Sequence, residues 1–174
     1  MSTKPGTALE VVKAHMAAED RQDLDATLAT FTEDCYYQVP GLGIDLRGKH
    51  EIRKWYEDLF TAIPDFRNSD EQYWEVKAGE TKAGEADGQV FFSAHMEGTH
   101  LGTWHGWAPT GRSFRSAMLV RIPIAADGLM KAEIAYNDSA DVFMQLGVLP
   151  RQGSSQERAM QALHRLRTRV PFLR

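Results

Sequence analysis

Cysteine and long apolar runs are both scarce in this sequence. Cys35 is the only cysteine among 174 residues, which excludes an intrachain disulfide and fits a reducing compartment. No apolar run approaches the roughly 18 residues that a membrane span requires. The first residues also lack the apolar core of a signal peptide. We therefore expect a cytoplasmic protein with no membrane partner.

A strong charge of one sign and metal-binding motifs are missing as well. The formal net charge of −4 argues against a general nucleic-acid binder, because such proteins carry a basic field. The sequence contains no His-Glu-x-x-His motif and no cysteine pair. His95 and His100 would face opposite sides of a regular strand, so a shared ion is not favoured. We expect neither a nucleic acid nor a metal as partner.

The order of the expected elements predicts one α+β domain. The hydrophobic share of 43% and the charged share of 25% are ordinary for a globular protein. Thr7 and Glu10 match a capping box that begins a helix ending near Asp20. Further helices are predicted at 24–31 and 50–62, and a helical turn at 143–147. Strands are predicted at 34–39, 72–77, 89–96, 113–124 and 129–138, with loops at 40–48 and 78–88. Helices on one side of a sheet follow from this order.

A glycine-rich stretch at 95–112 joins the two longest predicted strands. Because side chains alternate along a strand, one set should share the interior face: Val90, Phe92, Ala94, Met96 and His100. A second set recurs at every fourth position: Gly98, Gly102 and Gly106. Glycines in strand-forming sequence often mark bulges or close approach by a ligand.

The last predicted strand carries the sharpest chemical signal. Alternate residues of a strand share one face. The more apolar set is Met130, Ala132, Ile134, Tyr136 and Asp138, and the other set is Lys131, Glu133, Ala135 and Asn137. A carboxylate on a buried face is costly unless it is paired or functional. Burial would raise the pKa of Asp138 toward the range useful for proton transfer. The alternative is that Asp138 caps the helical turn that follows.

The tail differs in charge from the rest of the chain. Residues 151–174 hold six arginines and one acid, Glu157. A predicted helix at 156–169 spaces its apolar residues for one face: Met160, Leu163, Leu166 and Val170. A tail of this kind packs on its own body or on a second subunit, and an anionic surface is the alternative.

Two motifs carry a family resemblance. One is Gly98-Thr99-His100-Leu101-Gly102 followed by Pro109-Thr110-Gly111-Arg112, and the other runs from Tyr136-Asn137-Asp138 to Gln145-Leu146-Gly147. They resemble the central and closing segments of SnoaL-like proteins, and the resemblance covers about residues 8–150. We therefore divide the chain into a SnoaL-like domain at 1–150 and a basic amphipathic extension at 151–174.

The resemblance implies a cone-shaped α+β barrel of the nuclear-transport-factor-like superfold. In it, a curved mixed or antiparallel sheet wraps around three N-terminal helices and leaves an apolar pocket. Characterised members are polyketide cyclases that close a ring by intramolecular aldol condensation without metal or cofactor. The residue matching their acid/base aspartate is Asp138. In the mechanism that we favour, Asp138 removes a proton next to a carbonyl group and His100 stabilises the enolate oxygen, so both are expected to be catalytic. Curved sheets of this type commonly dimerise, so we expect a homodimer.

The expected substrate is hydrophobic and polycyclic, because aromatic walls suit a planar ligand. The residues expected to bind it are Tyr37, Trp55, Leu59, Trp74, Phe92, His105, Trp107, Met118 and Tyr136. A cofactor-free cyclase is the favoured function. The alternatives are a noncatalytic small-molecule binder of the same fold and an isomerase or epoxide-hydrolase-like enzyme.

Overall fold

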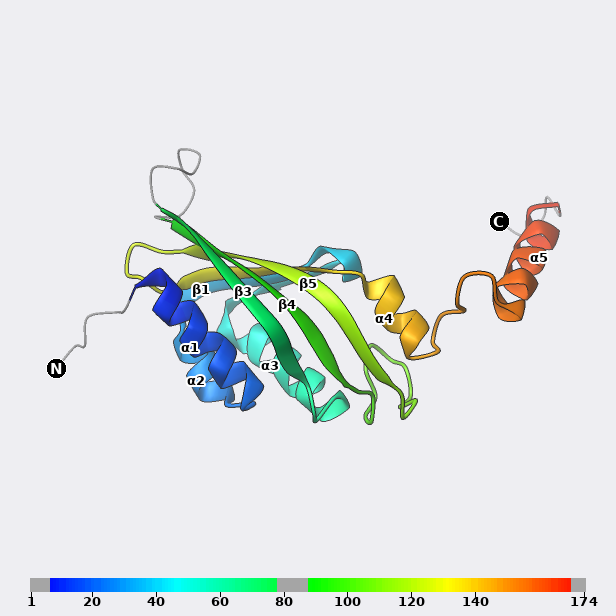
Figure 1. Cartoon of the computed structure of the whole chain (residues 1–174), viewed down its shortest axis with the longest axis horizontal. Helices are drawn as coiled ribbons and strands as arrows, with labels where there is room; N and C mark the ends of the chain where they lie inside the picture. The colour runs from blue at the N-terminus through cyan, green and yellow to red at the C-terminus, as the bar shows by residue number, and fades with distance from the viewer. Residues whose placement is uncertain (1–6, 78–87, 170–174) are drawn as a thin grey trace.

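A six-stranded curved sheet and the helices packed against it form the body of the protein (Figure 1). The computed structural model describes residues 7–77 and 88–169. The helices of the body are α1 (Ala8–Asp20), α2 (Leu24–Ala29), α3 (Gly48–Ala62) and α4 (Ser139–Gln145), with a 3-10 turn η1 (Pro40–Leu42). The strands are β1 (Phe31–Val39), β2 (Ile44–Arg47), β3 (Arg67–Lys77), β4 (Gly88–Thr99), β5 (Ser113–Ile124) and β6 (Met130–Asn137). Helix α5 (Ser155–Arg169) follows at a distance from the body.

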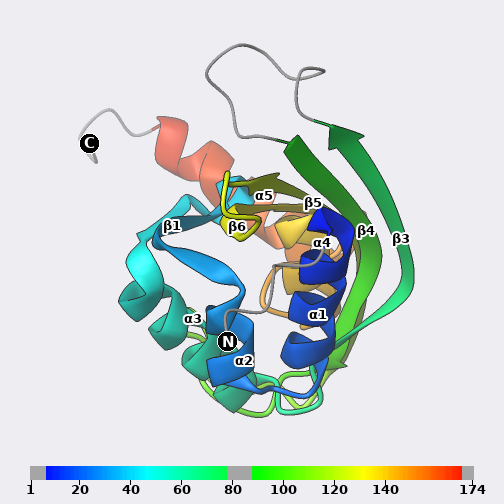
Figure 2. The same cartoon turned by 90° about the vertical axis from the view of Figure 1, so that its left-hand side faces the viewer.

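The sheet is mixed, in the order β2-β1-β6-β5-β4-β3. β1 and β6 run parallel, and the other neighbouring strands run antiparallel. The sheet bends around α1, α2 and α3 (Figure 2), which confirms the α+β class and the helix-filled sheet. Within the described residues, no helix is long and apolar enough to cross a membrane.

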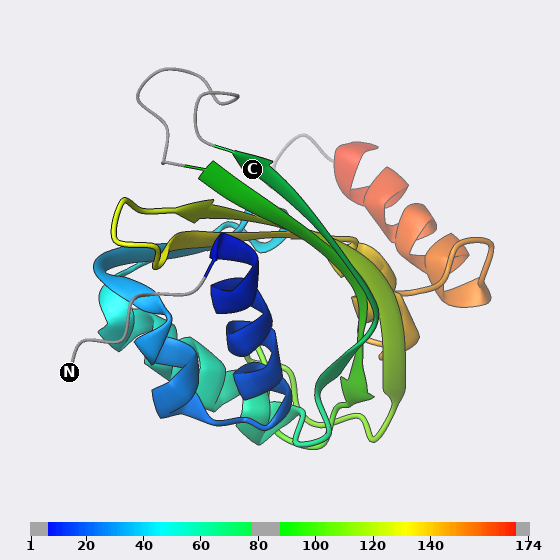
Figure 3. The same cartoon turned by 60° about the vertical axis from the view of Figure 1, so that its left-hand side comes forward.

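Helix α1 begins where the capping pattern places it. The Thr7 hydroxyl accepts from the Glu10 backbone N–H, and the Glu10 carboxylate accepts from the Thr7 N–H. This reciprocal pair satisfies two N–H groups that a helix start leaves free. Helix α3 buries a face that includes Ile52, Tyr56 and Leu59. These helices fill the concave side of the sheet (Figure 3).

Strand β4 has the predicted alternation, with its interior residues buried: Val90, Phe92, Ala94 and Met96. One other expectation is wrong, and a second falls almost entirely outside the described residues. The loop expected at 40–48 contains η1 and strand β2, because Ile44–Arg47 pairs with the end of β1. The expected loop 78–88 lies outside the described residues except Gly88, which belongs to β4.

Gly98 and Gly102 provide close approach, but to the protein's own chain, whereas a Cβ atom on Gly106 would meet nothing within 4 Å. A Cβ atom on Gly98 would lie 2.3 Å from Ile63 Cγ2, and one on Gly102 would lie 2.6 Å from the Thr61 carbonyl oxygen. Gly102 and Leu101 also donate their N–H groups to the Ala62 carbonyl. The bend after β4 is therefore held against the end of α3, where a side chain has no room.

We expect Gly102→Ala to lower the free energy of unfolding by about 1–3 kcal/mol, because the added methyl group meets backbone atoms. Urea unfolding measures this difference. Gly41→Ala is the matched control. Its Cβ would lie 3.2 Å from the Ser139 hydroxyl oxygen and 3.5 Å from the Asn137 carbonyl oxygen, so no backbone atom is closer than an ordinary contact. Equal stability of the two variants would contradict the close-approach explanation.

Candidate functional site

A cavity lies between the concave face of the sheet and the helices. The space between its walls is about 570 Å³, a figure that includes solvent at the open mouth. Most of its wall is apolar or aromatic, from Tyr37, Val39, Leu42, Trp55, Leu59, Phe66, Met96, Trp104, Phe114, Met118 and Ala135. Its polar wall residues are Glu19, Glu133 and Asn137. Two acids thus face an otherwise apolar space.

Strand β6 contributes Glu133, Ala135 and Asn137 to this wall. This is the opposite parity to the one expected, so the predicted interior face of β6 is wrong. Glu133 is only 3% exposed, whereas Tyr136 is 48% exposed. The acid that β6 places at the cavity is therefore Glu133.

Helix α1 contributes His15 and Glu19, which lie one turn apart. Residues four apart share a helix face, and this face also buries Val12 and Met16. One donor atom each of His15, Glu19 and Glu133 lie within 4.8 Å of one another, and all three residues are buried. Among the described residues, these three side chains form the group that could hold a metal ion.

Hydrogen bonds fix the orientation of His15 and Glu133. The Thr30 hydroxyl donates to the Thr27 carbonyl at 2.6 Å, so its oxygen accepts the 2.8 Å bond from His15 Nδ1. His15 then turns Nε2 toward Glu133 Oε2, at 3.2 Å, and donates to it when the ring carries a proton on both nitrogens. The Tyr56 hydroxyl donates to the same oxygen at 3.0 Å. Both contacts use Oε2, which leaves Glu133 Oε1 as the oxygen available to a ligand.

Glu19 has a different environment from Glu133. Its carboxyl group makes no hydrogen bond with other described side chains or backbone groups, and the residue is 5% exposed. Burial raises the pKa of Glu19 well above its ordinary value, and the negative charge of Glu133 raises it further. Burial likewise raises the pKa of Tyr37 and of Tyr56, so both hydroxyls remain proton donors. Glu19 and Glu133, the carboxylate pair, can thus combine a protonated acid with a base.

Four expected substrate-binding residues line the cavity: Tyr37, Trp55, Leu59 and Met118. Five others do not. Trp74, Trp107 and Tyr136 are each 48% exposed, and Phe92 is buried against Tyr73. His105 stacks beside Trp55 and Trp104 near the bend, where burial lowers its pKa.

Asp138 is not held in the cavity, which corrects the expected position of the catalytic acid. It is the N-cap of α4, and its carboxylate accepts the Asp141 N–H at 3.0 Å. Its side chain is exposed. The alternative expectation, a cap of the following helix, is the one confirmed. The cause is again the parity of β6, which points Asn137 rather than its neighbours into the cavity.

His100 is fully buried, as its parity predicted, but it does not line the cavity. Its Nδ1 lies 3.3 Å from the Thr110 hydroxyl, and its Nε2 has no hydrogen-bond partner among the described residues. Burial lowers the pKa of His100. Its backbone pairs with Arg112 and Gly111, so His100 fastens the two sides of the bend together.

Sequence reasoning missed His15, Glu19 and Tyr56. The available signal was helical spacing, because His15 and Glu19 occupy the same stripe as Val12 and Met16. A polar residue within an apolar stripe is informative, since it is buried only when partnered or functional. Tyr56 gave no comparable signal, because aromatic residues are ordinary on the buried face of a helix.

The chain belongs to the SnoaL-like polyketide cyclase family, whose model matches residues 9–146. Its structure resembles a proposed polyketide cyclase from Pseudomonas putida KT2440, with a TM-score of 0.69, 22% identity and coverage of 80% of this chain and 98% of the other. A second proposed polyketide cyclase, from Xanthomonas campestris pv. campestris, gives a TM-score of 0.68 and 17% identity, with coverage of 80% of this chain and 96% of the other. The structure also resembles AclR, a proposed hydroxylase from Streptomyces galilaeus, with a TM-score of 0.64, 17% identity and coverage of 93% of this chain and 94% of AclR. No curated protein matches the chain.

Proposed function

We propose that this protein is a small-molecule enzyme that uses the carboxylate pair for acid/base catalysis without a cofactor. The observation that carries the proposal is the burial of Glu19 and Glu133 together at the wall of an apolar cavity. Two acids so placed are costly for stability unless they are used. Membership of the SnoaL-like family supports the same class of chemistry.

The reaction we propose is enolisation followed by ring closure, as in an intramolecular aldol condensation. Glu133 Oε1 removes a proton from the carbon next to a carbonyl group. The electron pair moves onto the carbonyl oxygen, where the protonated Glu19 donates a hydrogen bond or its proton. The resulting carbon nucleophile attacks a second carbonyl of the same molecule, whose π electrons move to its oxygen. That oxygen takes the proton that Glu133 removed, and the first carbonyl re-forms and returns to Glu19 any proton that Glu19 gave it. The cavity lowers the entropic part of the barrier by holding the two ends together.

His15 and Tyr56 act in this mechanism as positioning residues. Both contact Glu133 Oε2, so they hold Oε1 toward the cavity without touching the substrate. The Tyr37 hydroxyl, also at the wall, is a second donor for a substrate oxygen.

A noncatalytic binder of the same fold is the second candidate. One observation favours it: the aspartate of the closing motif, Asp138, is exposed at a helix start. The cavity would then hold a hydrophobic ligand without converting it.

The two candidates are separated by exchange of α-protons in deuterated buffer. We expect the protein to accelerate exchange in 2-tetralone, a bicyclic aromatic ketone, as followed by proton NMR. Asp138→Asn should exchange at the wild-type rate, because asparagine also caps a helix start well. Binding of 2-tetralone without faster exchange would favour the noncatalytic candidate. A large loss of exchange in Asp138→Asn would return the catalytic role to the closing motif.

A further inference from the structure

A buried histidine stands beside the two buried acids at the cavity wall. One donor atom each of His15, Glu19 and Glu133 lie within 4.8 Å of one another, and the three residues are 0%, 5% and 3% exposed. We call them the buried trio. Glu19 and Glu133 also line the cavity, so a ligand held by the buried trio has an open side.

The hydrogen bonds of Thr30 determine which nitrogen of neutral His15 carries the proton. The Thr30 hydroxyl gives its single proton to the Thr27 carbonyl, so it accepts from His15 Nδ1. Nδ1 is therefore the N–H of the neutral ring, and Nε2 has the lone pair. A metal-binding histidine is held in the same way, because a hydrogen bond from its other N–H fixes the tautomer and the ring orientation.

The lone pair of His15 Nε2 faces an oxygen that has no proton to give it. Nε2 lies 3.2 Å from Glu133 Oε2, and this oxygen already accepts from the Tyr56 hydroxyl. Two lone pairs so close repel each other unless a cation attracts both of them. A proton on Nε2 removes the repulsion, and so does a metal ion that both side chains bind.

Glu19 supplies the ligand that can move. Its carboxyl group has no hydrogen-bond partner among the described residues, so it can turn without breaking a bond. Some contraction of the buried trio is required, because ligand atoms at about 2.0–2.2 Å from a zinc ion lie roughly 3.5 Å apart. Two buried carboxylates of like charge are costly, and one divalent ion offsets both charges.

The donor set indicates which ions fit. One imidazole nitrogen and two carboxylate oxygens suit a divalent transition metal, whereas Mg²⁺ and Ca²⁺ prefer oxygen ligands. Three protein ligands beside an open position form the arrangement of zinc sites in which water or substrate is the fourth ligand. Zn²⁺ is therefore the ion that matches the buried trio.

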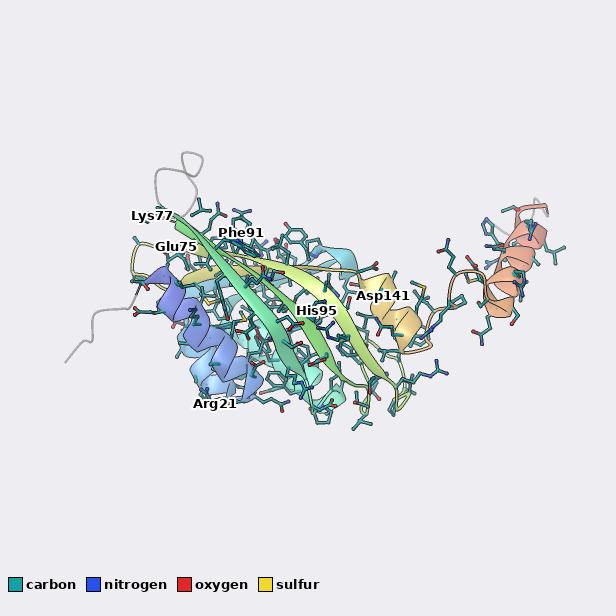
Figure 4. The ribbon with its side chains drawn as sticks, in the orientation of Figure 1. Arg21, Glu75, Lys77, Phe91, His95 and Asp141 are labelled. Carbon is teal, nitrogen blue, oxygen red and sulfur yellow. The ribbon has the colours of Figure 1, made fainter. Side chains whose placement is uncertain are left out.

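The expectation against a metal was drawn from other histidines, His95 and His100. The buried trio instead combines α1 with β6, which meet only through the fold. His95 lies on the outward face of β4, where its Nδ1 is 3.3 Å from Asp70 Oδ2 (Figure 4). Arg115 already pairs with that acid. His95 thus provides a control, because it is a histidine beside an acid whose charge is already offset.

We propose that the buried trio binds one Zn²⁺ ion and that the bound ion inhibits the enzyme. The inhibition rests on the proposed function, whereas the binding does not. Glu133 cannot remove a proton while its electron pairs are shared with the ion. Glu19 binds the ion as a carboxylate, so its proton passes to the solvent and is no longer available to a substrate oxygen.

Calorimetric titration of the full, metal-free chain with zinc chloride tests the binding. We expect one ion per chain. His15→Ala and Glu19→Gln should each weaken binding by at least about 100-fold, because each removes a ligand, and Glu19→Gln keeps the shape of the side chain. Thr30→Val should weaken it by about 10–100-fold, the range typical of a lost outer hydrogen bond to a metal-binding histidine. His95→Ala should bind as the wild type does.

Two results of the titration would overturn the site. One is the absence of stoichiometric binding by the wild type. The other is binding that both His15→Ala and Glu19→Gln leave unchanged, because the ion would then lie elsewhere.

α-Proton exchange in 2-tetralone separates the site from the proposed function. One equivalent of Zn²⁺ should stop the exchange, and removal of the ion with EDTA should restore it. Zn²⁺ bound at the buried trio of a protein that never exchanges 2-tetralone would support the site and remove the proposed function. Exchange by a protein that binds no Zn²⁺ would support the function and overturn the site. Exchange that continues with the ion bound would overturn the inhibition.

Discussion

Replacing Glu133 with glutamine is expected to slow α-proton exchange in 2-tetralone by about 10²–10⁴-fold, the range typical of a lost general base. Glutamine keeps the shape of the side chain and can still accept from Tyr56, so the fold and ligand binding should be retained. The loss should appear in the rate constant of the bound complex, because the variant removes a group that acts on the reacting proton.

Two comparisons make the Glu133→Gln experiment specific. Circular dichroism and ligand titration should show a folded protein that binds 2-tetralone as the wild type does. Tyr56→Phe should cause a smaller loss, because Tyr56 only positions Glu133 through its 3.0 Å hydrogen bond. An exchange rate that Glu133→Gln leaves intact would remove Glu133 as the base.

The second large effect concerns stability and pH. Burial and the charge of Glu133 raise the pKa of Glu19 above its ordinary value of 4.5. Between the unfolded and folded pKa values, the folded protein holds a proton that the unfolded chain has released. The free energy of unfolding therefore falls as pH rises from about 4.5 through this window, by at most about 1.4 kcal/mol per pH unit.

Glu19→Gln should remove this pH dependence, because an amide has no proton to lose. The variant and the wild type should be about equally stable at roughly one pH unit below 4.5, where Glu19 is mostly protonated even in the unfolded chain. Toward neutral pH the variant should become progressively more stable than the wild type. Urea unfolding at several pH values measures the difference. Parallel stability curves would show that Glu19 titrates alike in both states.

The sequence was sufficient to predict the regular elements whose two faces differ. In β4 the inward residues are buried while the outward ones are partly exposed. Apolar and more polar side chains therefore alternate along the strand, and this pattern is visible in the sequence. The capping box of Thr7 and Glu10 was readable because it depends on neighbours in sequence. Ten of the fourteen residues that line the cavity were not expected there, since residues as distant in sequence as Glu19 and Glu133 meet only through the fold.

Strand β6 shows why the candidate acid was misplaced. It lies in the middle of the sheet between β1 and β5, and residues of both parities are buried, including Ala132, Glu133, Ile134 and Ala135. When residues on both faces of a strand are buried, the two faces do not differ in polarity, so the sequence does not indicate which face lies inward. The more apolar parity was therefore taken for the interior, and that choice moved attention from Glu133 to Asp138.

Carbon-13 NMR of the side-chain carboxyl groups at pH 7, recorded with and without 2-tetralone, tests the central claim most directly. The account predicts that the Glu19 carboxyl carbon has the position of a protonated acid, that this signal disappears in Glu19→Gln, and that the ketone shifts the Glu19 and Glu133 signals while leaving Asp138 unchanged. An ionised Glu19 at pH 7, together with a ligand shift at Asp138 alone, would contradict it.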